Sequence, residues 1–211
     1  MIFPLVFSIA SAYKRRESAL QSFGILKSSL ASLYLMHRDC TNNDDPQATK
    51  QLHLTNRLLT LLPVCLQSSD QEHNRSLQEI YRLFQTFSSL HKQMLQRNVA
   101  PPCIAEANTL LHRAIVSFEE MKNIASYHTP ATLRAYSRIF LMAFPVLFSP
   151  YFANINLANS WVSGYLVAFI YSTVVVSLNN IQDHLENPYD GVGLDDLRLD
   201  TASEYTNLLA S

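Results

Sequence analysis

Hydrophobic residues recur at three- and four-residue steps through the first half of the chain, with polar breaks between the runs. This spacing predicts four helices, whose apolar faces run from Leu20 to His37, Leu54 to Cys65, Leu77 to Met94 and Ile104 to Met121. The polar segment Thr41 to Pro46 ends the first helix, and Pro101-Pro102 begins the fourth. Alternation at period two, which marks strands, is absent from this half. The pattern therefore predicts an all-α fold.

The second half is different, because no Lys, Arg, Asp or Glu lies between Arg138 and Asp183. Two apolar runs, 139–153 and 161–177, flank a polar hinge at 154–160. With flanking residues, each run approaches the roughly 20 residues that cross a hydrocarbon core. The pattern predicts a transmembrane hairpin. The alternative is a hairpin buried inside a large soluble protein, which needs more surrounding chain than 211 residues offer.

Positive charges flank the apolar segments. Ile2 to Tyr13 is too short to span alone and is followed at once by Lys14-Arg15-Arg16, while Arg134 and Arg138 precede the hairpin. Lys and Arg beside a span mark its cytoplasmic side. We therefore expect an integral membrane protein with a cytosolic helical body, built as one domain of four segments: a partial membrane segment at 1–13, mostly cytosolic helices at 14–129, the hairpin at 130–186 and a cytosolic end at 187–211.

Composition excludes several functions. Charged residues make up 16% of the chain, against roughly 25% in soluble domains. The formal net charge is -1 without a basic stripe, which gives no support to nucleic acid as a partner. Four glycines are too few for phosphate-binding loops. The seven histidines form no metal-binding pair on a helix, and His37-Arg38-Asp39 lacks the glycine-rich loop that accompanies a kinase motif. We predict no enzyme, no cofactor and no metal.

The three cysteines, Cys40, Cys65 and Cys103, are far apart in sequence and form no Cys-x-x-Cys pair. This spacing argues against a zinc site and against a disulfide framework. We therefore predict three buried or half-buried free thiols.

The segment after the second apolar run begins with Pro188, which ends a helix because the residue before a proline is driven out of the α region. Asp195 and Asp196 follow in a turn, where they are either solvated turn residues or part of a functional acidic run. Thr201 and Glu204 form the pattern of a capping box, which predicts a short final helix.

Three segments carry a resemblance to a known family. They are FPLVFSIASAYKRRESAL near the N-terminus, Thr129-Pro130 with the LRAY segment that follows, and ENPYDGVGLDDLRLD after the last apolar run. Together they resemble the bestrophin family of anion channels, including its bacterial and plastid relatives. The third segment is the most specific, because it follows a charge-free span at the spacing found in the family.

The resemblance implies a homopentamer whose central pore conducts chloride and other small anions. It implies a pore neck at Phe3 and Phe7, a second constriction at Tyr127, and a family motif at Pro130, Asn187, Pro188, Asp195 and Asp196. Two and a half spans cannot enclose an aqueous path, so any pore must lie on a symmetry axis between subunits. Rings of Phe can present electropositive edges to an anion while a dry constriction excludes hydrated cations. The alternative role for both Phe residues is packing the helix against its neighbours.

The sequence also departs from the family. The family has a complete span before the pore helix, whereas this chain starts at Met1, so the resemblance implies an N-terminally truncated member. The calcium clasp of animal members is incomplete here, because His184 replaces a polar amide and Gly191 and Gly193 interrupt the acidic run. A second hypothesis is a non-conducting membrane-anchored protein whose cytosolic helices bind a partner. Either protein would lie in a plasma, organellar or plastid membrane.

Overall fold

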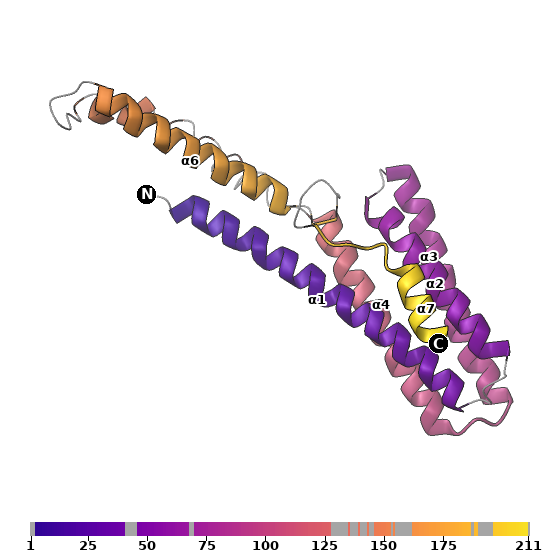
Figure 1. Ribbon diagram of the computed structural model, residues 1–211. Helices are drawn as coiled ribbons and strands as arrows, with labels where there is room; N and C mark the ends of the chain where they lie inside the picture. Colours follow the sequence, from indigo (N-terminus) through magenta and orange to yellow (C-terminus); the bar gives the residue numbers. More distant parts are fainter. Residues whose placement is uncertain are drawn as a thin grey trace. The chain divides into compact units, whose positions relative to one another are not determined.

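The computed structural model describes residues 3–40, 46–67, 70–127, 135, 139, 143, 146–152, 154, 162–186, 188–189 and 196–210. Its helices are α1 (Phe3–Cys40), α2 (Pro46–Gln67), α3 (Asp70–Gln96), α4 (Pro101–Ser126), α6 (Val162–Glu186) and α7 (Ala202–Ala210), with a further helical stretch at 146–152 (Figure 1). Over these residues the chain is helical and has no strand, which confirms the predicted all-α fold.

The helices belong to two compact units. Unit 1 comprises Met1–Arg16 and Tyr127–Pro188, and unit 2 comprises Glu17–Ser126 and Tyr189–Ser211. Unit 1 therefore contains the first turns of α1 together with α6. Unit 2 contains the rest of α1 with α2, α3, α4 and α7. The four segment boundaries expected from the sequence remain a prediction.

The core of unit 2 is formed by the helix faces that the periodicity predicts. The fully buried side chains include Leu26, Leu30, Leu58, Phe87 and Phe118, which come from α1, α2, α3 and α4. Leu20 is the exception on α1: its side chain is 50% exposed, so its assignment to the buried face is wrong. The next position at helical spacing, Phe23, is buried. The core-facing stripe of α1 therefore includes Ala19 and Phe23 rather than Leu20.

Helix α3 ends at a Schellman motif. The Asn98 N–H bonds to the Leu95 carbonyl and the Val99 N–H bonds to the Met94 carbonyl, at 3.2 Å each. This motif requires a left-handed residue, and Asn98 adopts a φ of 59°. Asn tolerates that conformation better than most side chains do. Pro101 then begins α4 as predicted, at a position where the missing N–H costs no helical hydrogen bond.

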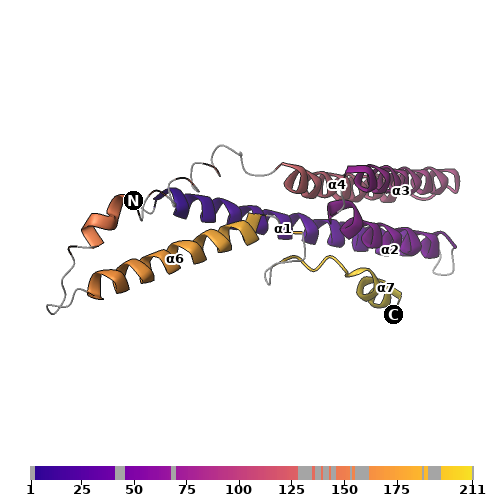
Figure 2. The ribbon, with the colours of Figure 1, turned by 90° about the horizontal axis from the view of Figure 1, so that it is seen from above.

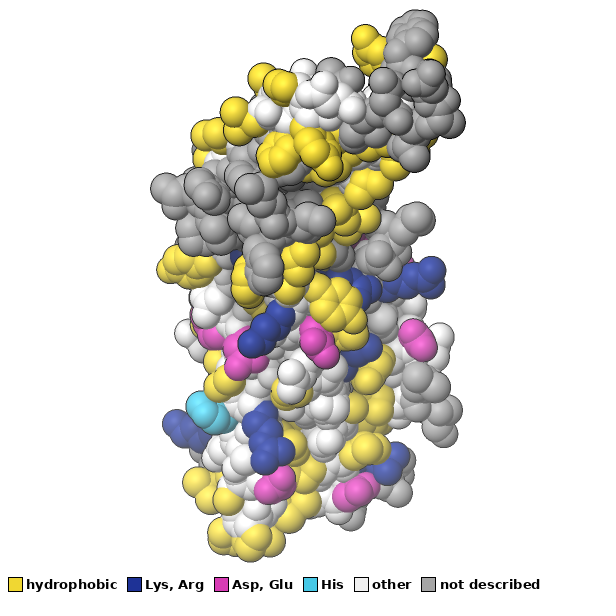
Figure 3. Space-filling model, turned by 90° about the vertical axis from the view of Figure 1, so that its left-hand side faces the viewer, with side chains coloured by type: hydrophobic (Ala, Val, Ile, Leu, Met, Phe, Trp, Pro, Cys, Tyr) yellow, Lys and Arg dark blue, Asp and Glu magenta, His cyan; other side chains and the backbone are white. Residues whose placement is uncertain are grey.

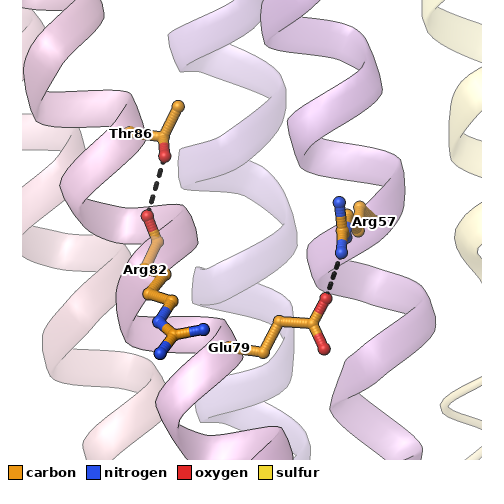
Figure 4. Close-up of polar contacts among 4 residues, drawn as sticks. All are labelled: Arg57, Glu79, Arg82 and Thr86. Atoms are coloured by element: carbon orange, nitrogen blue, oxygen red, sulfur yellow. Dashed lines mark hydrogen bonds and ion pairs between the residues drawn. The ribbon is translucent and has the colours of Figure 1, made fainter.

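Polar contacts between the helices of unit 2 show which helices are neighbours and in which direction they run. Gln47 near the start of α2 bonds to Gln93 near the end of α3, and Arg57 pairs with Glu79 farther along (Figure 4). Helices α2 and α3 are therefore antiparallel. Figure 2 shows α3 beside α4, where the His91 ring bonds to Asn108. These surface and half-buried contacts set the register, while the buried apolar faces supply most of the stability.

The C-terminal segment packs onto the body of unit 2. Tyr189 is fully buried, Leu199 is 3% exposed, and the backbone carbonyl of Tyr189 accepts a 2.6 Å hydrogen bond from Gln67 Nε2. Helix α7 begins directly after Thr201, as the capping box predicts, and the Tyr205 N–H bonds to the Thr201 carbonyl at 3.0 Å. The Thr201 hydroxyl has no hydrogen-bond partner within the described part of the chain, so the side-chain half of the box does not form there.

In unit 1 the second apolar run is helical, because α6 contains all of it from Val162 onward. Most of the first apolar run and the hinge at 154–160 lie outside the described residues. None of the helices among the described residues combines the length and the apolar character needed to cross a membrane.

Candidate pore segment and exposed apolar surface

The candidate neck lies in the first turns of α1. Phe3 and Phe7 are four residues apart, so a continuous helix places both on one face. Pro4 is compatible with this helix because it falls in the first turn, where N–H groups have no intrahelical acceptor. The Phe7 side chain is 68% exposed, whereas Phe3 is described by its backbone alone. One bulky aromatic of the predicted pair is therefore available to contact another molecule.

Apolar side chains dominate the exposed surface of unit 1. On α6 they form a set that is 47–73% exposed, namely Val162, Tyr165, Leu166, Phe169, Ile170, Val174, Val176 and Ile181. Val6 and Tyr13 on α1 are exposed as well. Figure 3 shows hydrophobic side chains gathered over this part of the chain, while charged side chains gather elsewhere. Soluble monomers rarely expose so large an apolar surface, which indicates a site for lipid or protein contact.

A basic cluster, Lys14-Arg15-Arg16, follows these apolar turns of α1. The Arg15 guanidinium donates a hydrogen bond to the backbone carbonyl of Tyr127, the residue directly after α4. This bond links α1 to the other chain segment of unit 1. The Tyr127 side chain is 75% exposed. The second constriction that the resemblance implies at Tyr127 remains a prediction.

The predicted family motif, which lies before and after α6, is described only in part. Pro130, Asn187 and Asp195 lie outside the described residues, while Pro188 is buried and Asp196 is half-buried. In the segment after α6 the prominent side chain is Tyr189, whose ring is fully buried in unit 2 and whose burial the hydrophobic pattern does not predict. One signal was present, because Tyr189 is the only Phe, Tyr or Trp between Tyr171 and Tyr205. Among the described residues, the chain after Pro188 therefore packs against the core of unit 2 through Tyr189.

A buried polar pair lies inside unit 2. The rings of His37 on α1 and His91 on α3 are 5.2 Å apart between centroids, and both side chains are almost completely buried. His91 Nδ1 lies 2.8 Å from Asn108 Oδ1 on α4 and donates to it, since an amide oxygen only accepts. The periodicity placed His37 on the core-facing stripe correctly. The partner His91 could not be predicted, because it comes from a different helix.

Burial determines the protonation of this pair. Loss of water, reinforced by repulsion from His91, lowers the pKa of His37 to about 4. Burial also lowers the pKa of His91, although its hydrogen bond to Asn108 acts in the opposite direction. Both rings are therefore neutral near pH 7. Elsewhere in the described parts of the chain, no three His, Cys, Asp or Glu side chains are grouped so as to hold a metal ion.

The three thiols are free, as predicted from their spacing. Cys65 is buried, and Cys40 and Cys103 are half-buried. Burial raises the pKa of the Cys65 thiol to about 11, with Lys122 acting weakly in the other direction. Cys65 is therefore an inert core thiol.

Comparison with known proteins gives a clear result for the fold. No protein-family profile and no curated protein sequence matches the chain. Solved structures do match: a variant of a bacterial bestrophin homologue from Klebsiella pneumoniae has a TM-score of 0.80 at 14% identity, over 98% of this chain and 81% of that one. A second structure of that homologue, solved by zinc phasing, has a TM-score of 0.77 at 13% identity, with the same coverage. A structure described as a membrane protein has a TM-score of 0.81 at 14% identity, again over 98% and 81% of the two chains. The chain therefore has the fold of the bacterial bestrophin homologues.

Proposed function

We propose that this chain is a subunit of a bestrophin-like anion channel, which conducts chloride through a central pore between the copies of a homopentamer. The observation that carries the proposal is the likeness of fold to the bacterial bestrophin homologues over 98% of the chain. The three sequence segments that resemble the family point to the same function.

Unit 1 is the part of the chain that enters the membrane. Burying a Val, Leu, Ile or Phe side chain completely is worth about 1.5–3 kcal/mol. The exposed apolar side chains on α6 and on the first turns of α1 would leave a large apolar surface in contact with water, which is unfavourable. Lipid, or neighbouring subunits within lipid, would remove that cost. Lys14, Arg15 and Arg16 then lie at the cytoplasmic surface.

The neck is formed by Phe3 and Phe7 from each subunit. A ring of Phe7 side chains on a symmetry axis would present aromatic edges to a passing anion, and its apolar walls would resist filling by water. The exposure of Phe7 supports this role, because a side chain that only packed α1 within its own subunit would be buried. The basic residues on the following turns would concentrate anions at the entrance.

Flux measurements on the purified full chain in liposomes test the proposal. We expect chloride efflux that exceeds the efflux from protein-free liposomes and that persists when sodium is replaced by a large organic cation. Alkaline carbonate extraction of the same liposomes verifies insertion. Complete release of the protein by carbonate, or inserted protein without anion flux, would contradict the channel assignment.

The alternative is a non-conducting membrane-anchored protein whose helical body binds a partner. The observation in its favour is the exposure of Leu20, Ile25 and Leu35 on α1 within unit 2, at 38–50%. The flux experiment separates the two functions, because the alternative predicts carbonate-resistant protein that leaves chloride gradients intact.

A further inference from the structure

Cys40 and Cys103 are brought to the same end of the helical body. Ser22 Oγ on α1 donates a 2.8 Å hydrogen bond to Glu120 Oε2 on α4, and Arg15, earlier on α1, bonds to the carbonyl of Tyr127, directly after α4, so the two helices run antiparallel. From the Ser22–Glu120 contact, Cys40 lies about 27 Å along α1 and Cys103 lies about 26 Å back along α4, at about 1.5 Å per residue. Figures 1 and 2 show the end of α1 and the start of α4 at the same end of unit 2.

Both thiols also lie on the inward-facing sides of their helices. Cys40 is three residues beyond the buried His37, and Cys103 is four residues before the buried Ala107. Residues three and four apart share a helix face, so each cysteine continues a core-facing stripe. Each thiol is half-buried rather than sealed in the core, and the Cys103 thiol is near enough to Cys40 to contribute to the raised pKa of Cys40.

We propose that Cys40 and Cys103 form a reversible disulfide, which joins the end of α1 to the start of α4 when a small disulfide oxidant such as oxidised glutathione is present. One protein thiolate attacks the oxidant and releases one molecule of reduced glutathione. The other protein thiolate then attacks the mixed disulfide and releases the second. Two electrons pass from the protein to the oxidant, and the two protons of the protein thiols end on the two glutathione molecules. This inference does not depend on the proposed channel function.

The environment of Cys40 makes the reaction slow at neutral pH. Burial, followed by the hydrogen bond to Cys103, its charge and that of Asp39, raises the pKa of Cys40 to about 11. Whichever cysteine reacts first, the Cys40 sulfur must attack once as a thiolate. The oxidation is therefore carried out at mildly alkaline pH over hours, with reduced glutathione as the parallel control.

Thiol counting by mass spectrometry tests the proposal on the purified full chain. After incubation, the protein is denatured and alkylated without reductant, and the mass of the intact chain is measured. We expect three alkylated cysteines after reduced glutathione and one, Cys65, after oxidised glutathione, with a peptide pair joined through Cys40 and Cys103. Treatment with dithiothreitol should restore all three. Three alkylated thiols after oxidation, stable glutathione adducts, or disulfide-linked dimers would each overturn the proposal.

Single variants supply the matched controls. Cys65→Ala should still lose two alkylation sites on oxidation, whereas Cys40→Ser and Cys103→Ser should form no internal disulfide. Circular dichroism verifies that each variant is folded. The loop closed by the bond contains all of α2 and α3, so oxidation should raise the melting temperature of the wild type and of Cys65→Ala but not that of Cys40→Ser. An equal rise in Cys40→Ser would show that oxidation stabilises the protein by another route and would refute the assignment.

Discussion

Acid should destabilise the helical body through the buried His37. The pKa of this ring is lowered to about 4 from an ordinary value of 6.5, so the folded protein favours the neutral form. The unfolded chain binds a proton below pH 6.5, while the folded chain resists binding it until about pH 4. This contribution to stability is therefore complete above pH 6.5 and is lost progressively as the pH falls toward 4.

The magnitude follows from the two pKa values of His37. A difference between 6.5 and about 4 corresponds to about 3 kcal/mol of unfolding free energy, most of which disappears across this window. His37 has no exposed surface, so solvent screening reduces this value little. His91 should act in the same direction, because burial also lowers its pKa. A loss of this size is a large fraction of the roughly 5–15 kcal/mol that stabilises a typical domain.

Chemical denaturation followed by circular dichroism, repeated between pH 7 and 4, measures this effect. His37→Leu removes the titrating ring and replaces it with an apolar side chain, so the decline in stability with acid should be shallower than in the wild type. His112→Gln is the matched control, since His112 is an exposed histidine on α4. Its slope should equal that of the wild type. Equal slopes in the wild type and His37→Leu would refute the linkage.

Three further predictions concern packing and ion binding. Phe23→Ala should cost about 3–5 kcal/mol of unfolding free energy in chemical denaturation, because its side chain is 3% exposed in the core of unit 2. Tyr189→Ala should cost a similar amount and should speed tryptic cleavage at the exposed Arg198, since it removes the ring that fixes the C-terminal segment; unchanged cleavage would contradict this role. Calcium titration should change neither melting temperature nor anion flux, because Gly191 and Gly193 interrupt the acidic run; a saturable micromolar response would contradict this.

The helical part of the fold could be predicted because its signal is local. A buried helix face repeats every 3.6 residues, and the stripes on α2, α3 and α4 appear in the sequence with that period. Leu20 was wrongly assigned to the buried face because it lies at the edge of the α1 stripe. At such a position the packing of neighbouring helices, and not sequence spacing, determines whether the side chain is buried. The final helix was predicted at Thr201 by its capping pattern, although within the described residues the Thr201 hydroxyl makes no hydrogen bond.

Contacts between distant segments could not be predicted in the same way. His37 and His91 meet only after α1 and α3 pack, and Cys40 meets Cys103 only after α1 and α4 do. Tyr189 lies in a polar segment whose periodicity gives no sign of burial. For the candidate neck, the continuous helix α1 places Phe3 and Phe7 on one face, while the pore role that the resemblance implies for them remains a prediction. In the proposed channel the partners of that face are neighbouring subunits, and these contacts remain part of the proposal.

Single-channel recording of two phenylalanine variants tests the central claim most directly. Phe7 on α1 and Phe169 on α6 are similarly exposed, at 68% and 73%, but only Phe7 belongs to the proposed neck. Phe7→Ala should widen the constriction and make it easier to wet, which raises anion conductance or relaxes gating. Phe169→Ala should leave both unchanged. Wild-type conductance and gating in Phe7→Ala, or equal changes in both variants, would contradict a pore lined by α1.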